Sequence, residues 1–301
     1  MQIIRLFLKI YSHFVIIFLM KKKIIALMYD FDRTLATQDM QNFEFIPSLG
    51  LTPEEFWEKT NIFCEKNNTD RILGYMFVML DECKKRNIKL TYDYLKDQGK
   101  HVDFYKGVLT WFDRINKYAE SKGFKCEHYL ISSGNKEIVD GTALADKFTH
   151  IFGCEYFFDK TTKEAIWPKF MVNYTQKTQC FYKISKGATQ TNYDDVKVNQ
   201  KVNKRRIPYR NMIYLGDGIT DVPIMILTKN NGGTSIAVYN DSKNKEKVEK
   251  LLQDSRVNFI CKADYSENKA IDKVVKLTID SIAIQDELIY KYQKDDKIKK
   301  V

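Results

Sequence analysis

The sequence contains few of the residues that cysteine or zinc chemistry requires. Its six cysteines lie far apart, no two form a C-x-x-C pair, and their spacing matches no zinc site. A cysteine nucleophile needs an activating base, and none of the four histidines stands in the sequence context of a cysteine protease. We therefore expect reduced thiols in the core of a cytoplasmic protein.

A run of apolar residues long enough to span a membrane is also missing. Residues 1–20 are rich in Ile, Leu and Phe, but Arg5, Lys9 and His13 interrupt them. Lysines at 21–23 follow at once, without the small-residue cleavage site of a signal peptide. We expect residues 1–20 to be an upstream extension outside the fold, with Met20 as the native start. The competing interpretation is a weak anchor to a membrane surface.

The net charge of the chain excludes fewer functions than its missing motifs and its lack of a long apolar run do. The chain has 49 Lys and Arg against 39 Asp and Glu, a net charge of +10 that is spread along the sequence. This excess suits an anionic ligand. No zinc finger, aromatic RNA-binding signature or basic heptad accompanies it, so we expect no nucleic-acid partner.

Short β-rich runs alternate with amphipathic, helix-like stretches, which predicts an α/β fold with a three-layer, Rossmann-like parallel sheet. The runs are residues 24–29, 129–131, 212–215, 235–239 and 257–261. Residues 38–106 show helical spacing and are too long for an ordinary connection, so they predict an inserted helical cap. The expected division is a core of 21–37 and 107–285, the cap, a polar insertion loop at 187–206 and a charged tail at 286–301.

Polar clusters follow three of the predicted strands. Asp30 and Asp32 follow the first, Ser132 and Ser133 follow the run at 128–131, and Asp217 and Asp221 follow the run at 211–215. Taken singly, each is an ordinary acidic turn or serine helix cap. Parallel strands bring their carboxyl ends to one edge of the sheet, where α/β proteins bind ligands. The three clusters together therefore predict a shared site for a metal and an anion.

With these motifs, the sequence resembles the haloacid dehalogenase-like hydrolases, in particular the phosphoserine-phosphatase-like branch with a helical cap. The resemblance rests on residues 30–35 (DFDRTL), 130–134 (LISSG), Lys177 and 216–221 (GDGITD). The sequence departs from the pattern at Arg33, where many relatives carry glycine.

The resemblance implies a magnesium-dependent phosphatase that hydrolyses a small phosphomonoester through an aspartyl phosphate. Asp30 would be the nucleophile and Asp32 the general acid and base. Ser132, or its neighbour Ser133, and Lys177 would bind the phosphoryl group. Magnesium would be held by Asp30, the backbone carbonyl of Asp32 and Asp217, with Asp221 in support.

Two alternatives remain open at this point. One is a phosphotransferase that passes the aspartyl phosphate to a second substrate, and the other is a phosphate-binding protein without activity. Asp32 disfavours a dehalogenase, because a departing halide needs no proton. The lysine position also has a rival at Lys183.

Overall fold

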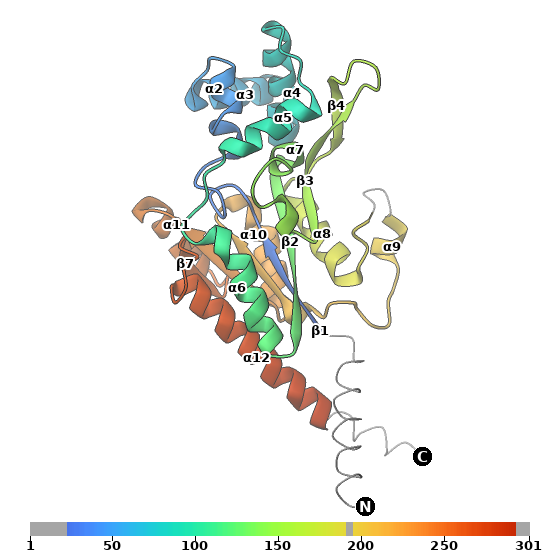
Figure 1. Cartoon of the computed structure of the whole chain (residues 1–301), viewed down its shortest axis with the longest axis vertical. Coiled ribbons are helices and arrows are strands. Elements are labelled where there is room, and N and C mark those ends of the chain that lie inside the picture. The colour runs from blue at the N-terminus through green and yellow to red at the C-terminus, as the bar shows by residue number, and fades with distance from the viewer. Residues whose placement is uncertain (1–22, 191–194, 293–301) are drawn as a thin grey trace, which may run out of the picture.

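A seven-stranded sheet forms the centre of the computed structural model, which describes residues 23–190 and 195–292 (Figure 1). The strand order is β4-β3-β2-β1-β5-β6-β7, and every neighbouring pair is parallel except β3 and β4. The strands are β1 (Lys23–Tyr29), β2 (Phe124–Asn135), β3 (His150–Phe158), β4 (Ala165–Phe170), β5 (Met212–Gly216), β6 (Thr234–Tyr239) and β7 (Phe259–Lys262). The predicted parallel α/β core is thus confirmed, whereas residues 1–20 lie outside the described part.

Strand β1 is the central strand that positions the site. It pairs with β2 on one side and β5 on the other. All its residues after Lys23 are buried, because helices cover both faces of the sheet. A continuous apolar run such as Ile24–Tyr29 therefore forms a strand here, where an alternating pattern would place polar side chains in the core.

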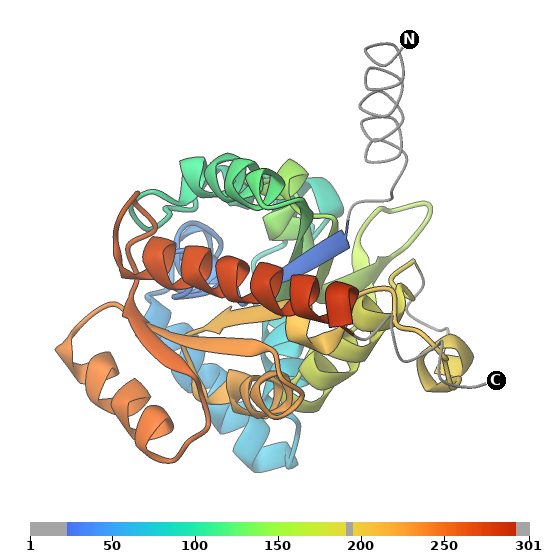
Figure 2. The same ribbon diagram turned by 90° about the horizontal axis from the view of Figure 1, so that it is seen from below.

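Helices cover the two faces of this sheet, with α6 and α12 packed together on one and α8 and α10 on the other (Figure 2). The helices of the core are α6 (Val108–Ser121), α7 (Lys136–Val139), α8 (Tyr174–Lys186), α9 (Asp195–Asn199), α10 (Val222–Asn230), α11 (Ser242–Gln253) and α12 (Ala270–Tyr292), with short 3-10 turns η3 (Ala145–Lys147), η4 (Tyr209–Asn211) and η5 (Ile219–Asp221).

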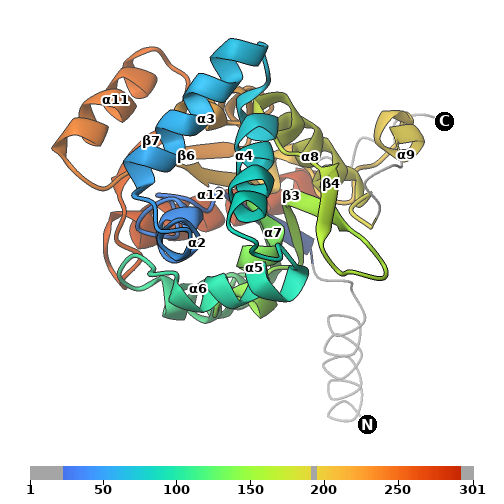
Figure 3. The ribbon, with the colours of Figure 1, turned by 90° about the horizontal axis from the view of Figure 1, so that it is seen from above.

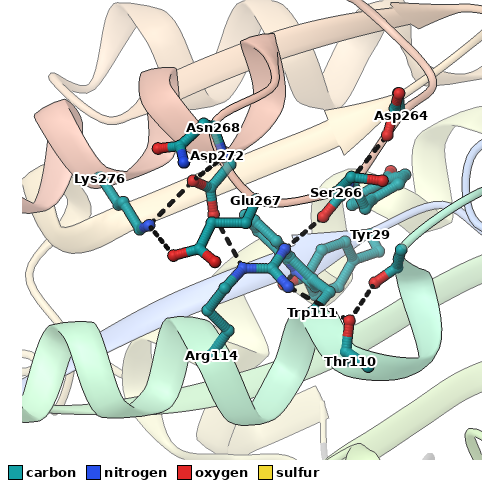
Figure 4. Close-up of polar contacts among 12 residues, drawn as sticks. Tyr29, Thr110, Trp111, Arg114, Asp264, Ser266, Glu267, Asn268, Asp272 and Lys276 are labelled. Carbon is teal, nitrogen blue, oxygen red and sulfur yellow. Dashed lines mark hydrogen bonds and ion pairs between the residues drawn. The ribbon is translucent and has the colours of Figure 1, made fainter.

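Buried polar contacts join α6 to α12 and to β1 (Figure 4). Arg114 on α6 donates from Nε to Asp272 on α12 at 3.1 Å. On the same helix, Trp111 donates from Nε1 to the hydroxyl of Tyr29 at 2.9 Å. Because Asp272 and Trp111 are fully buried, these bonds hold α6 against α12 and against β1, the strand that leads into Asp30.

Between β1 and α6 the chain forms a helical insertion that lies at one end of the molecule (Figures 1 and 3). It contains η1 (Met40–Asn42), α2 (Phe45–Ser48), α3 (Pro53–Asn67), α4 (Arg71–Lys85), α5 (Tyr92–Gln98) and η2 (Gly99–His101). A capping box between Thr52 and Glu55 starts α3, and the Asp70 side chain caps α4. The chain re-enters the core at Gly107, where a side chain would collide with the backbone of Tyr265 and Ser266.

Several elements differ from the sequence-based expectation. The antiparallel hairpin of β3 and β4 was not predicted, the last strand begins at Phe259, and helix α9 lies within the expected polar loop. Helix α12 continues to Tyr292, so the expected boundary at residue 285 falls inside a helix. All six cysteines are free and buried, as expected. Among the described helices, none has both the length and the apolar character needed to cross a membrane.

Candidate active site

Asp30 and Lys177 form a buried ion pair at the carboxyl end of β1. Asp30 is 6% exposed and Lys177 is fully buried. The Lys177 Nζ donates to Asp30 Oδ1 at 2.9 Å and to Asp221 Oδ1 at 2.6 Å. One ammonium group thus bridges two carboxylates that come from different strand ends.

Helix α8 places Lys177 in this position. The Asn173 side chain caps the helix by accepting from the backbone N–H groups of Thr175 and Gln176, so Lys177 lies in the first turn. Burial alone would lower the pKa of Lys177, but the carboxylates of Asp221 and Asp30 outweigh it and raise the pKa. The rival lysine, Lys183, is also buried but does not line the cavity described below.

Asp221 is held by three donors and cannot move freely. Besides Lys177, the Tyr214 hydroxyl donates to its Oδ1 at 2.7 Å and the Gly218 N–H to its Oδ2 at 3.2 Å. The Asp221 carboxylate also lies against Gly216, where any side chain would collide with it. This arrangement suits a residue that orients its neighbours, which is the supporting role implied for Asp221.

Asp217 completes a cluster of carboxylates that could hold a metal ion. One oxygen each from Asp30, Asp217 and Asp221 lie within 4.8 Å of one another. Burial, followed by the charges of Asp30 and Asp221, holds the pKa of Asp217 well above its usual value. Carboxylate oxygens are the protein ligands that magnesium prefers, so these residues fit such an ion.

Asp32 follows Asp30 by two residues and lies beside the helical insertion. Its Oδ1 accepts from the backbone N–H of Met40 at 2.8 Å. Burial, with the nearby charges of Asp39 and Asp30, holds the pKa of Asp32 well above its usual value. A raised pKa favours the protonated form of a carboxyl group, which is the form that a general acid needs.

The two adjacent serines occupy different environments. Ser133 lines the cavity, and its Oγ is buried without a hydrogen-bond partner in the described structure. Ser132 is fully buried outside the cavity lining, and its Oγ accepts from the Gly134 N–H at 2.9 Å. Of the two positions left open by the sequence, the structure therefore brings Ser133 to the carboxylates.

A cavity of about 650 Å³ lies above this cluster and joins the sheet edge to the helical insertion. Its lining comprises Asp30, Asp32, Arg33, Asp39, Gln41, Trp57, Thr60, Arg71, Ile72, Tyr75, Ser133, Gly134, Lys177, Asp217, Gly218 and Thr220. The residues from Asp39 to Tyr75 were not predicted as site residues. No motif marks them, because they reach the site through the packing of the insertion.

Solved structures share this fold at low sequence identity. A HAD family hydrolase from Salmonella enterica serovar Typhi has a TM-score of 0.53 at 14% identity, covering 84% of this chain and 70% of that one. A substrate-bound phosphoserine phosphatase gives 0.53 at 12%, with 85% and 99% covered. A phospho-aspartyl intermediate analogue of phosphoserine phosphatase gives 0.51 at 13%, with the same coverage.

Sequence comparison alone adds little. No family model matches the chain. An uncharacterised protein of Borreliella burgdorferi is 26% identical over 275 residues, covering 82% of this chain and 93% of that protein. The structural likeness nevertheless confirms the predicted fold: the chain has the haloacid dehalogenase-like fold found in phosphoserine phosphatases.

Proposed function

We propose that the chain is a magnesium-dependent phosphatase that hydrolyses a small phosphomonoester through an aspartyl phosphate on Asp30. The observation that carries this proposal is the buried Lys177 bridge between Asp30 and Asp221, with Asp217 beside it, under a cavity. A carboxylate can approach a phosphoryl group only where positive charge offsets the repulsion between the two anions.

In the proposed reaction an oxygen of Asp30 attacks phosphorus, and the bond between phosphorus and the leaving oxygen breaks. Asp32 donates its proton to that oxygen, and the alcohol departs. Asp32 then takes a proton from water, whose oxygen attacks the phosphorus of the aspartyl phosphate. The bond to Asp30 breaks, inorganic phosphate leaves and both carboxyl groups return to their starting state.

The remaining residues would hold the phosphoryl group during these steps. Lys177 would contact its oxygens from the side of Asp30, and the unpartnered Ser133 hydroxyl would donate to another oxygen. Magnesium, held by Asp30, Asp217 and the backbone carbonyl of Asp32 with Asp221 in support, would supply a Lewis acid for the phosphoryl oxygens. The helical insertion would act as the cap that covers the site.

The test is phosphate release from p-nitrophenyl phosphate and a panel of metabolite phosphomonoesters, with magnesium and with chelator. We expect magnesium-dependent turnover in the wild type and its loss in Asp30→Asn. Asp93→Asn, which changes an exposed aspartate on α5, is the matched control and should retain activity.

Two results would contradict the proposal. Asp30→Asn with a tenth or more of the wild-type activity would refute the covalent route. A phosphorylated Asp30 detected by mass spectrometry, with no inorganic phosphate released and a new phosphomonoester formed only when a second alcohol is added, would instead identify a phosphotransferase.

A further inference from the structure

Arg33 is a feature of the site that the proposed reaction does not use. It lies between Asp32 and Thr34 in the turn after β1 and has a φ of 56°. Side chains are disfavoured in this left-handed conformation, which glycine adopts without strain. The chain therefore has an arginine where its backbone favours glycine, at the edge of the cavity.

The guanidinium group of Arg33 is held at the cavity with most of its donors unused. One Nη2 hydrogen bond reaches Asp39 Oδ2 at 2.9 Å, and no other hydrogen bond of this side chain is present among the described residues. The side chain is 47% exposed and lines the cavity. A guanidinium carries five N–H donors, so it can bind Asp39 and an anion together.

The turn and the helical insertion together fix this group in place. Asp39 pairs with Arg33, while the next residue, Met40, donates its N–H to Asp32. The proposed general acid and the guanidinium are thus held by consecutive residues. Asp32 and Arg33 both line the cavity, in which the leaving group would lie next to Asp32.

A second arginine enters the same cavity from the insertion. Arg71 is exposed, lines the cavity and donates from Nη2 to the Asn61 side chain at 2.7 Å. Its guanidinium has no salt bridge within the described residues. By contrast, the buried Lys177 is occupied by Asp30 and Asp221. The cavity therefore has one cationic group at depth, Lys177, for the phosphoryl group and two more toward solvent.

We propose that Arg33, assisted by Arg71, binds a second anionic group on the leaving side of the substrate, a carboxylate or a second phosphate. This inference rests on the proposed phosphatase function and narrows its substrate class. A phosphomonoester with a neutral or cationic leaving group would leave Arg33 with Asp39 and Arg71 with Asn61 as their hydrogen-bond partners, and the remaining N–H donors of both facing water.

The test compares substrates that differ in the second anion alone. O-phosphoserine is paired with phosphoethanolamine, which lacks the carboxylate, and glucose 1,6-bisphosphate is paired with glucose 6-phosphate. We expect the wild-type kcat/KM to favour the anionic member of one pair by about tenfold or more, as one charge-assisted hydrogen bond provides. Which pair shows the preference identifies carboxylate or phosphate.

Arg33→Gly is the decisive variant, because it removes the guanidinium while easing the backbone. We expect the preference to fall by roughly tenfold, chiefly through KM, with partial recovery in Arg33→Lys and no loss of thermal stability. Arg256→Gln is the matched control. That arginine is 46% exposed, pairs with Asp254 and lies outside the cavity lining.

Binding to Asp30→Asn, measured by calorimetry with the same four compounds, gives a readout that needs no turnover. Equal affinities within each pair, or a preference unchanged by adding Arg33→Gly, would overturn the role of Arg33. A wild type without any phosphatase activity but with this binding preference would instead refute the proposed function and leave the anion site standing.

Discussion

Replacing Lys177 by methionine is the sharpest test of how the site is built. The substitution removes two charge-assisted hydrogen bonds, at 2.9 Å to Asp30 and 2.6 Å to Asp221, and leaves both carboxylates buried. At roughly 1.5–3 kcal/mol for each bond to a charged group, the loss amounts to about 3–6 kcal/mol. The measured cost of breaking a buried ion pair, about 3–5 kcal/mol, falls in the same range.

The stability assay is thermal or urea unfolding of Lys177→Met against the wild type. For a large chain, 1 kcal/mol corresponds to a shift of roughly 2–4 °C, so the expected decrease in Tm is about 6–24 °C. Turnover should fall by about two to three orders of magnitude, because a preorganised charge is lost from the site.

Lys183→Met is the matched control, since Lys183 is a buried lysine of the same helix and lies over the Phe170 ring at 5.8 Å. It should lower stability while retaining most of the activity. An unchanged Tm in Lys177→Met would refute the bridge, and an inactive Lys183→Met beside an active Lys177→Met would refute the lysine assignment.

Four further outcomes are expected. Asp32→Asn should slow turnover by about two to four orders of magnitude, as measured by kcat, and a smaller loss would argue against proton transfer by this residue. Magnesium at 100 times its Kd should stabilise the wild type by about 2.7 kcal/mol in thermal unfolding, and Asp217→Asn should lose this stabilisation. An equal stabilisation of both proteins would place the ion elsewhere. Glu127 accepts two bonds from Arg206 at 2.7 Å, and although burial opposes it, these bonds lower the pKa of Glu127 to about 2. A carboxyl group whose pKa is lowered in the folded state stabilises the fold at pH values above its usual pKa of 4.5. In urea unfolding at pH 7, Glu127→Gln should therefore lower the free energy of unfolding by about 2 kcal/mol. This difference should shrink as the pH falls from 4.5 toward 2. The six buried cysteines should resist a thiol reagent in the native protein and all react after unfolding; fast labelling of the native protein would contradict their burial.

The sequence was sufficient for the central strands and for the residues at their ends. Residues 24–29 are apolar without interruption, which is the pattern of a strand covered on both faces, and Asp30 follows directly. The hairpin of β3 and β4 was not predicted because it is only partly buried. Phe157 and Trp167 pair across its two strands and are both exposed, so apolar residues there do not mark the core.

The choice between Ser132 and Ser133 shows where sequence reasoning ends within the site itself. In a regular strand successive residues face opposite sides, so strict alternation would assign only one of the two serines to the cavity. Strand β2 continues to Asn135, but its pairing with β3 shifts in register between Ile131 and Asn135. Alternation counted from the regular part of the strand therefore fails at the serines, and only the folded geometry decides between them.

The charges of the buried cluster explain why these motifs belong together. Asp30, Asp217 and Asp221 carry three negative charges when ionised, and Lys177 supplies one positive charge, which leaves a formal charge of −2. A buried excess of this kind is costly unless a cation offsets it, and hydrophobic packing cannot provide that offset. A divalent cation matches this excess of two negative charges. The arrangement of one lysine and three aspartates thus suits a protein that binds a metal ion and an anion at the same place.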